Sequence, residues 1–193
     1  MTTTQKPQLA PPGAGLPWIE LQIARILFGL RCRLGNRASF LQTFRDEQEK
    51  IRALIGRFPA EDRGRQILIP RAVGLEDSSR HYSAWMVLDH LRIVNNACVT
   101  IIGELTAGHA MSGSASTATV KPDPAADASV EALYETSCRD VLSTIQSAGE
   151  LHTEIRYPHP WFGPLDGHGW AAMVAMHMGI HRNQLALMLQ NVS

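Results

Sequence analysis

The chain has 193 residues, enough for one domain to bury a hydrophobic core without disulfides. Lys plus Arg and Asp plus Glu each total 18, so no net charge is available to attract nucleic acid or an anionic membrane. Cys32, Cys98 and Cys138 are odd in number and far apart, which argues against a disulfide framework and a zinc knuckle. We therefore expect a cytoplasmic protein with reduced, buried thiols that binds neither nucleic acid nor membrane.

The N-terminal region divides into a tail and a long amphipathic stretch. Residues 1–16 contain no apolar segment of a secretory signal and are predicted to be disordered, ahead of a single domain over residues 17–193. From Pro17 onward apolar residues recur at spacings of three and four, which is typical of a helix. Gly35 and Asn36 interrupt this pattern near residue 35. The pattern predicts either one broken helix or two consecutive helices ending near residue 55.

Three further helices are predicted after a connection over residues 56–78, within which residues 66–69 could be extended. The Asp77-Ser78-Ser79 cluster is expected to cap the next helix, which continues to about residue 105. Residues 107–128 are small, polar and Pro-containing, and this linker is long enough to cross the length of a bundle. Another helix is predicted over residues 129–147.

The last predicted helix has a well-defined start. Asp166 is expected to be its N-cap, with Leu165 and Trp170 as a hydrophobic staple, and the helix continues to about residue 190. The fold class is therefore predicted as all-α. We expect a four-helix bundle with an elaborated N-terminal helix and a long linker between helices two and three.

Two histidines in the last predicted helix have a spacing that suits metal binding. His177 and His181 are four residues apart, so their imidazoles lie one turn apart on the same side and can be directed to one point. His90, in the apolar stripe of the second helix, is the candidate for a third ligand. A lone histidine on an apolar face is more often a core residue, and an HxxxH spacing arises easily by coincidence.

The three histidines together favour a metal, because burying several imidazoles without partners leaves unsatisfied polar groups in an apolar core. Three neutral imidazoles leave coordination positions open, as in catalytic rather than closed structural sites. The predicted cofactor is a divalent transition metal, zinc first, with Ni, Co or Fe(II) as alternatives. Met178 stands where the HExxH metalloproteases carry glutamate, so a protease is disfavoured, and no general base can be named.

Residues around the triad receive simpler interpretations. Gln184 follows His181 on the ligand face and could bond a ligand imidazole. Asp89 points about a third of a turn away from His90 and is interpreted as a surface charge. His159 and His168 flank the loop before the last helix and could line the mouth of a pocket, but they are interpreted as surface residues.

Two segments resemble a known family. WMVLDHLRIVNNA in the second helix and HPWFGPLDGHGWAAMVAMHMGIHRNQL at the end look like the DinB-like superfamily of helical bundles, which includes YfiT-type metal-dependent hydrolases. The resemblance implies metal ligands at His90, His177 and His181, and the family's members include thiol-dependent transferases and frequent homodimers. The longer N-terminal region and the 107–128 linker depart from the family's pattern, which puts the pocket shape and the dimer surface in doubt.

Three hypotheses follow for function. The first is a metal-dependent enzyme that acts on a small molecule, either as a hydrolase or as a thiol-dependent S-transferase that uses a low-molecular-weight thiol. The second is a non-catalytic metal- or small-ligand-binding bundle. The third is a helical bundle without metal, in which the histidines bond one another and water.

Overall fold

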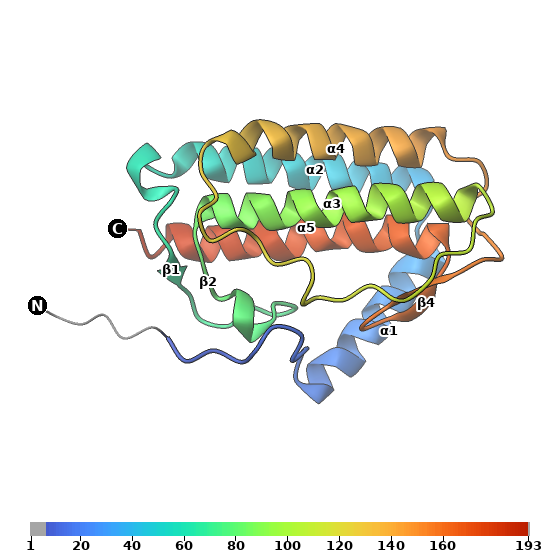
Figure 1. Ribbon diagram of the computed structural model, residues 1–193, viewed down its shortest axis with the longest axis horizontal. Coiled ribbons are helices and arrows are strands. Elements are labelled where there is room, and N and C mark those ends of the chain that lie inside the picture. The colour runs from blue at the N-terminus through green and yellow to red at the C-terminus, as the bar shows by residue number, and fades with distance from the viewer. Residues whose placement is uncertain (1–6, 193) are drawn as a thin grey trace, which may run out of the picture.

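The computed structural model describes residues 7–192, which are mostly helical, so the all-α prediction is confirmed (Figure 1). Four helices lie side by side with similar axes, and a fifth, at the N-terminal end, leaves them at an angle. The four pack as a closed ring, α2 on α5, α5 on α3, α3 on α4 and α4 on α2. The helices are α1 (Trp18–Leu34), α2 (Arg37–Arg57), α3 (Ala84–Thr106), α4 (Ser129–Ser147) and α5 (Gly167–Leu189).

Two short antiparallel strand pairs accompany the helices. The first pairs β1 (Ile67–Leu68) with β2 (His81–Tyr82), and the second pairs β3 (Tyr157–His159) with β4 (Gly163–Leu165). β1 falls within the stretch for which an extended conformation is predicted. No helix within residues 7–192 is both long and apolar enough to cross a membrane.

The break between α1 and α2 lies at Gly35 and Asn36, so the amphipathic stretch forms two helices. The side chain of Asn36 accepts a hydrogen bond from the amide of Ser39, and the hydroxyl of Ser39 accepts one from the amide of Asn36. This reciprocal cap fixes the start of α2. A Cβ at position 35 would collide with the ring of Phe40, so only glycine fits the corner.

The predicted start of α3 is wrong. Residues 77–79 form a short 3-10 turn, and α3 begins at Ala84, where Ser83 accepts a hydrogen bond from the amide of Met86. The carboxylate of Asp77 instead accepts bonds from the Arg80 side chain and the Ala10 amide. Pairing of β2 with β1 holds residues 81–82 extended, so the polar cluster cannot open a helix.

The N-terminal tail is only partly described, since residues 1–6 lie outside the described residues. From residue 7 the chain lies against the domain: the amide of Ala10 donates to Asp77 at 2.7 Å, and Leu16 is buried. The division into a disordered tail over residues 1–16 and a single domain over residues 17–193 stays a prediction.

The linker over residues 107–128 runs along the ring of helices from the end of α3 to the start of α4 (Figure 1). It contains turns but neither helix nor strand, as its composition predicts. The amide of Ala115 donates to the carbonyl of Pro158, and the hydroxyl of Thr117 donates to Glu76. The linker is therefore fastened to two other loops on one side of the ring.

The start of α5 confirms the predicted cap. Asp166 accepts a hydrogen bond from the amide of Gly169 at 2.8 Å, and α5 begins one residue after Asp166. Leu165 and Trp170, predicted as a hydrophobic staple, are both buried. This cap fixes the residue at which α5 begins.

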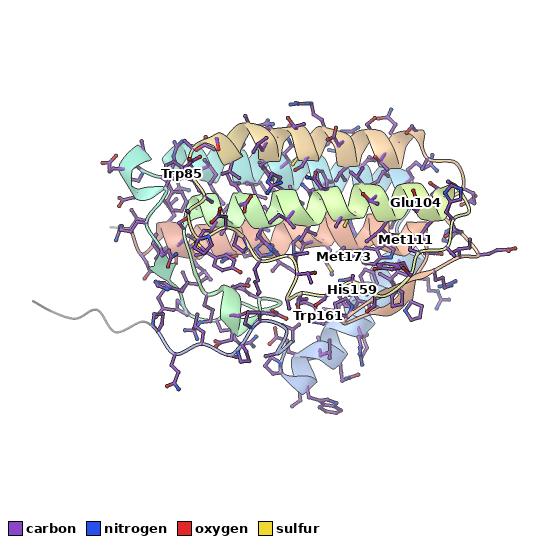
Figure 2. The ribbon with its side chains drawn as sticks, viewed as in Figure 1. Trp85, Glu104, Met111, His159, Trp161 and Met173 are labelled. Atoms are coloured by element: carbon purple, nitrogen blue, oxygen red, sulfur yellow. The ribbon has the colours of Figure 1, made fainter. Side chains whose placement is uncertain are left out.

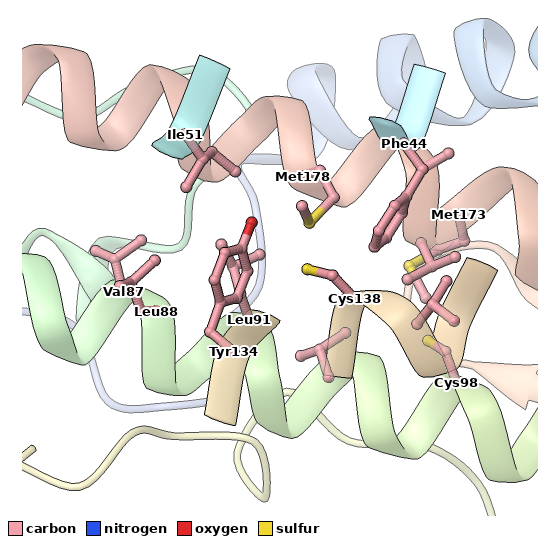
Figure 3. Close-up of a cluster of buried hydrophobic side chains, with 14 of the residues drawn as sticks. Phe44, Ile51, Val87, Leu88, Leu91, Cys98, Tyr134, Cys138, Met173 and Met178 are labelled. Carbon is pink, nitrogen blue, oxygen red and sulfur yellow. The ribbon is translucent and has the colours of Figure 1, made fainter. Parts of the chain in front are cut away.

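The core lies between the four packed helices and is shown in Figure 3. Phe44, Leu91 and Met178 meet there with the free thiols of Cys98 and Cys138, and burial raises the pKa of both thiols to about 12. The prediction of reduced, buried cysteines is correct for these two. Cys32 on α1 is also free but only half-buried.

Candidate metal centre

The structure brings His90, His177 and His181 together, as predicted. His90 lies on α3, and the other two lie one turn apart on α5, which packs against α3. The Nε2 atoms of His90 and His177 are 3.2 Å apart, and those of His177 and His181 are 3.1 Å apart. The three imidazoles thus direct their Nε2 atoms to one point between the helices and could hold a metal ion.

These separations fit a metal ion at the centre of the group. For bonds of about 2.1 Å to histidine nitrogen, two ligand atoms are roughly 3.0 Å apart at a right angle and roughly 3.4 Å apart in a tetrahedron. The observed distances of 3.1 and 3.2 Å lie within this range. All three ligand atoms lie within 4.8 Å of one another.

Two of the imidazoles are held in a single tautomer by hydrogen bonds on the far side of the ring. Nδ1 of His90 donates to the carbonyl of Val120 at 2.6 Å, since a carbonyl oxygen can only accept. The amide nitrogen of Gln184 donates to the carbonyl of Ser79, so its oxygen faces Nδ1 of His181 and accepts a bond at 2.7 Å. Both histidines therefore present an Nε2 lone pair to the centre.

The imidazole of His177 cannot donate to the Nε2 lone pairs of both His90 and His181. His177 could donate from Nε2 to either His90 or His181, but a neutral ring that donates from Nε2 has no second hydrogen there to give. Its Nδ1 is buried and has no hydrogen-bond partner among residues 7–192. A cation at the centre would engage all three nitrogens, whereas without one at least one buried lone pair stays unpaired.

Burial keeps these imidazoles neutral. It lowers the pKa of His90 to about 4, and it lowers the pKa values of His177 and His181 well below the usual range, with the neighbouring imidazoles adding to the effect. Neutral imidazole is the form that binds metals. The site is therefore ready to ligate at neutral pH without losing protons.

A cavity of about 110 Å³ adjoins the three histidines. Its walls come from α3, α5, the linker, the connection between β1 and α3, and the loop between β3 and β4. Figure 2 shows His159, Trp161 and Met173 near one another at this cavity, which all three residues line. Loops distant in sequence thus enclose the open side of the candidate metal centre.

His159 is part of this wall, so the interpretation as a surface residue is wrong and the alternative, that it lines a pocket, is correct. Its ring stacks on Phe162 with centroids 4.8 Å apart, and its Nδ1 accepts a hydrogen bond from the amide of Trp161 at 3.1 Å. Burial lowers the pKa of His159 to about 4. The Pro-containing sequence around it indicates a loop but not that the loop folds back over the helices.

Two more surface interpretations are wrong. His168 is buried, and its Nε2 donates to the carbonyl of Cys32, which ties α5 to α1. Asp89 is also buried; it pairs with Arg92 at 2.8 Å and accepts a hydrogen bond from the amide of Asp123 in the linker. Asp89 thus holds the linker in place rather than contacting solvent.

The prediction for Gln184 is confirmed, whereas other functional groups carry no sequence signal. Val120 contributes only its backbone carbonyl, and Glu76 and Lys121 form an ion pair at 3.2 Å across 45 positions. Met178 is fully buried in the core, so it takes no part in the site. The metal-binding group found among residues 7–192 consists of the three histidines without a carboxylate or thiol.

Comparison of this chain with protein-family models, with curated proteins and with solved structures finds no match.

Proposed function

We propose that this protein is a four-helix bundle of the DinB-like type that uses His90, His177 and His181 to bind one divalent transition metal. The closed ring of α2 to α5 supports the bundle, and the order of the ligands, one on α3 and an HxxxH pair on α5, supports the family. Of the departures from the family, the linker lines the cavity, and α1 contacts the loop that contains Trp161.

The proposed function is that of a metal-dependent enzyme acting on a small molecule, by hydrolysis or by transfer of a thiol. The observation that carries it is that His90 and His181, whose tautomers are fixed, direct their Nε2 lone pairs towards the imidazole of His177 beside a cavity. A divalent metal in a three-histidine site lowers the pKa of a water or thiol ligand towards neutrality. Zinc is the proposed ion, because four-coordinate zinc with three histidines keeps one position open.

The chain's own residues have separate parts in this proposal. The three histidines hold the ion, while Val120 and Gln184 fix the tautomers of His90 and His181. The loop with Trp161 forms part of the cavity wall. A non-catalytic metal-binding role is the second candidate. The same three histidines support this role if no substrate enters the cavity.

Elemental analysis tests the metal. The wild-type chain, purified with zinc, nickel or iron available, is expected to carry close to one ion per chain, and His90→Ala and His181→Ala are expected to lose it. His109→Ala, in an exposed histidine of the linker, is the matched control and should retain the metal. A wild-type chain that stays metal-free under these conditions contradicts the proposal.

A screen of ester, amide and thiol-transfer substrates then separates the two candidate functions. Turnover by the loaded wild type that disappears in His181→Ala supports the enzyme. Stoichiometric metal without turnover of any substrate class supports the binding role.

A further inference from the structure

The charges at the cavity are already paired with each other. Apart from the histidines, the described residues that line it include two ionisable charged side chains, Glu76 and Lys121, whose charged groups lie 3.2 Å apart. Glu76 also accepts from the hydroxyl of Thr117, and Lys121 also donates to the hydroxyls of Ser78 and Ser79. A charged ligand would therefore lose its hydration without gaining a free counter-charge.

The remaining wall is mainly apolar. Val94, Ile101, Met173, Trp161 and Trp170 line it, together with the buried thiol of Cys98. The volume of about 110 Å³ is close to that of apolar protein cavities of about 150 Å³ that bind benzene. The space therefore suits roughly one ring or one branched aliphatic group.

We propose that this cavity binds a compact, uncharged ligand with an aromatic or branched aliphatic body, whose polar atom faces the three Nε2 atoms. The chemical role of this ligand as a substrate rests on the proposed function. Binding of the apolar body is independent of the proposed function, because the apolar walls exist without a metal. The size and the paired charges favour such a group inside the cavity over a large or strongly charged one.

Ligand binding to the full-length, chelator-treated protein tests this proposal without the metal. Benzyl alcohol and benzoate are the matched probes, since they are similar in size and differ in charge, and binding is followed by tryptophan fluorescence and calorimetry. Benzyl alcohol is expected to bind at least tenfold more tightly than benzoate. Equal or tighter binding of benzoate would overturn the proposal.

A cavity-filling variant locates the binding. Ala97→Phe, in the wall, is expected to weaken benzyl alcohol binding at least tenfold, whereas Ala53→Phe on the exposed side of α2 should leave it unchanged. Binding that persists in Ala97→Phe places the probe elsewhere and contradicts the proposal. Metal analysis of the same proteins before chelator treatment keeps the two failures apart, because stoichiometric metal without probe binding contradicts only the ligand class.

Discussion

The side-chain oxygen of Gln184 lies 2.7 Å from Nδ1 of His181, three residues earlier on α5. The amide nitrogen of Gln184 is bound to the carbonyl of Ser79 at 2.7 Å, so the orientation of the amide is fixed from outside α5. One buried side chain thereby decides which nitrogen of His181 faces the candidate metal centre. Through this contact the connection between β1 and α3, which also lines the cavity at Glu76 and Ser79, orients a ligand of the candidate metal centre.

Gln184→Leu should weaken metal binding by roughly 10- to 100-fold, because His181 would lose the acceptor that fixes its tautomer. Gln184→Glu keeps an acceptor for Nδ1 and is expected to bind metal more tightly than Gln184→Leu. Competition with a chromophoric chelator measures both affinities. Equal affinity of wild type and Gln184→Leu would show that the contact does not orient the ligand.

Lys121→Met should lower the free energy of unfolding by about 2–4 kcal/mol, because it leaves the buried carboxylate of Glu76 without its cation. The double variant Lys121→Met/Glu76→Gln removes the unpaired charge and should recover part of the loss. Urea unfolding of the metal-free proteins measures both changes. No recovery in the double variant would mean that Lys121 acts by packing rather than by charge.

Acid should destabilise the metal-free protein partly through His159. Its pKa is about 4 in the folded chain and 6.5 as a model value, so between these values the unfolded chain binds more protons. The contribution of neutral His159 to the free energy of unfolding is therefore complete above pH 6.5. It is lost as the pH falls towards 4, by up to about 3 kcal/mol. Other buried histidines also lose stabilising free energy in acid, so the effect of His159 is tested by comparing the wild type with a variant of this residue.

In that comparison, the wild type and His159→Asn are unfolded in urea at several pH values. Asparagine keeps an oxygen that can accept the Trp161 amide but does not titrate, so the variant should show the shallower dependence on pH. The same slope in both proteins would contradict the assignment to His159.

Asp166→Ala should destabilise the protein by about 1 kcal/mol through loss of the cap on α5, whereas Asp166→Asn keeps an acceptor for the amide of Gly169 and should cost less. Thermal unfolding of the metal-free proteins measures the difference. Because both α5 ligands follow this cap, Asp166→Ala should also bind metal less tightly. An unchanged melting temperature in Asp166→Ala would show that α5 does not depend on the cap.

The helices and the ligand triad could be predicted because their signals are local. Apolar spacing defines the helices, and Asn36 and Asp166 are residues of the type that caps a helix start. The spacing of His177 and His181 places two imidazoles on one side of α5. The third ligand, His90, could be proposed because the apolar stripe of its helix directs it inward. Such features follow from helix geometry alone.

Only the tertiary structure decided the surroundings of the triad. Nothing near Asp77 in sequence shows that β2 pairs with β1 and delays α3 to Ala84. Similarly, Asp89 and His159 look like surface residues until the linker and the β3–β4 loop fold over them. The Asp123 amide that bonds Asp89 and the Trp170 ring against which His159 packs lie on other segments, and such contacts depend on how the helices pack, which local propensity does not encode.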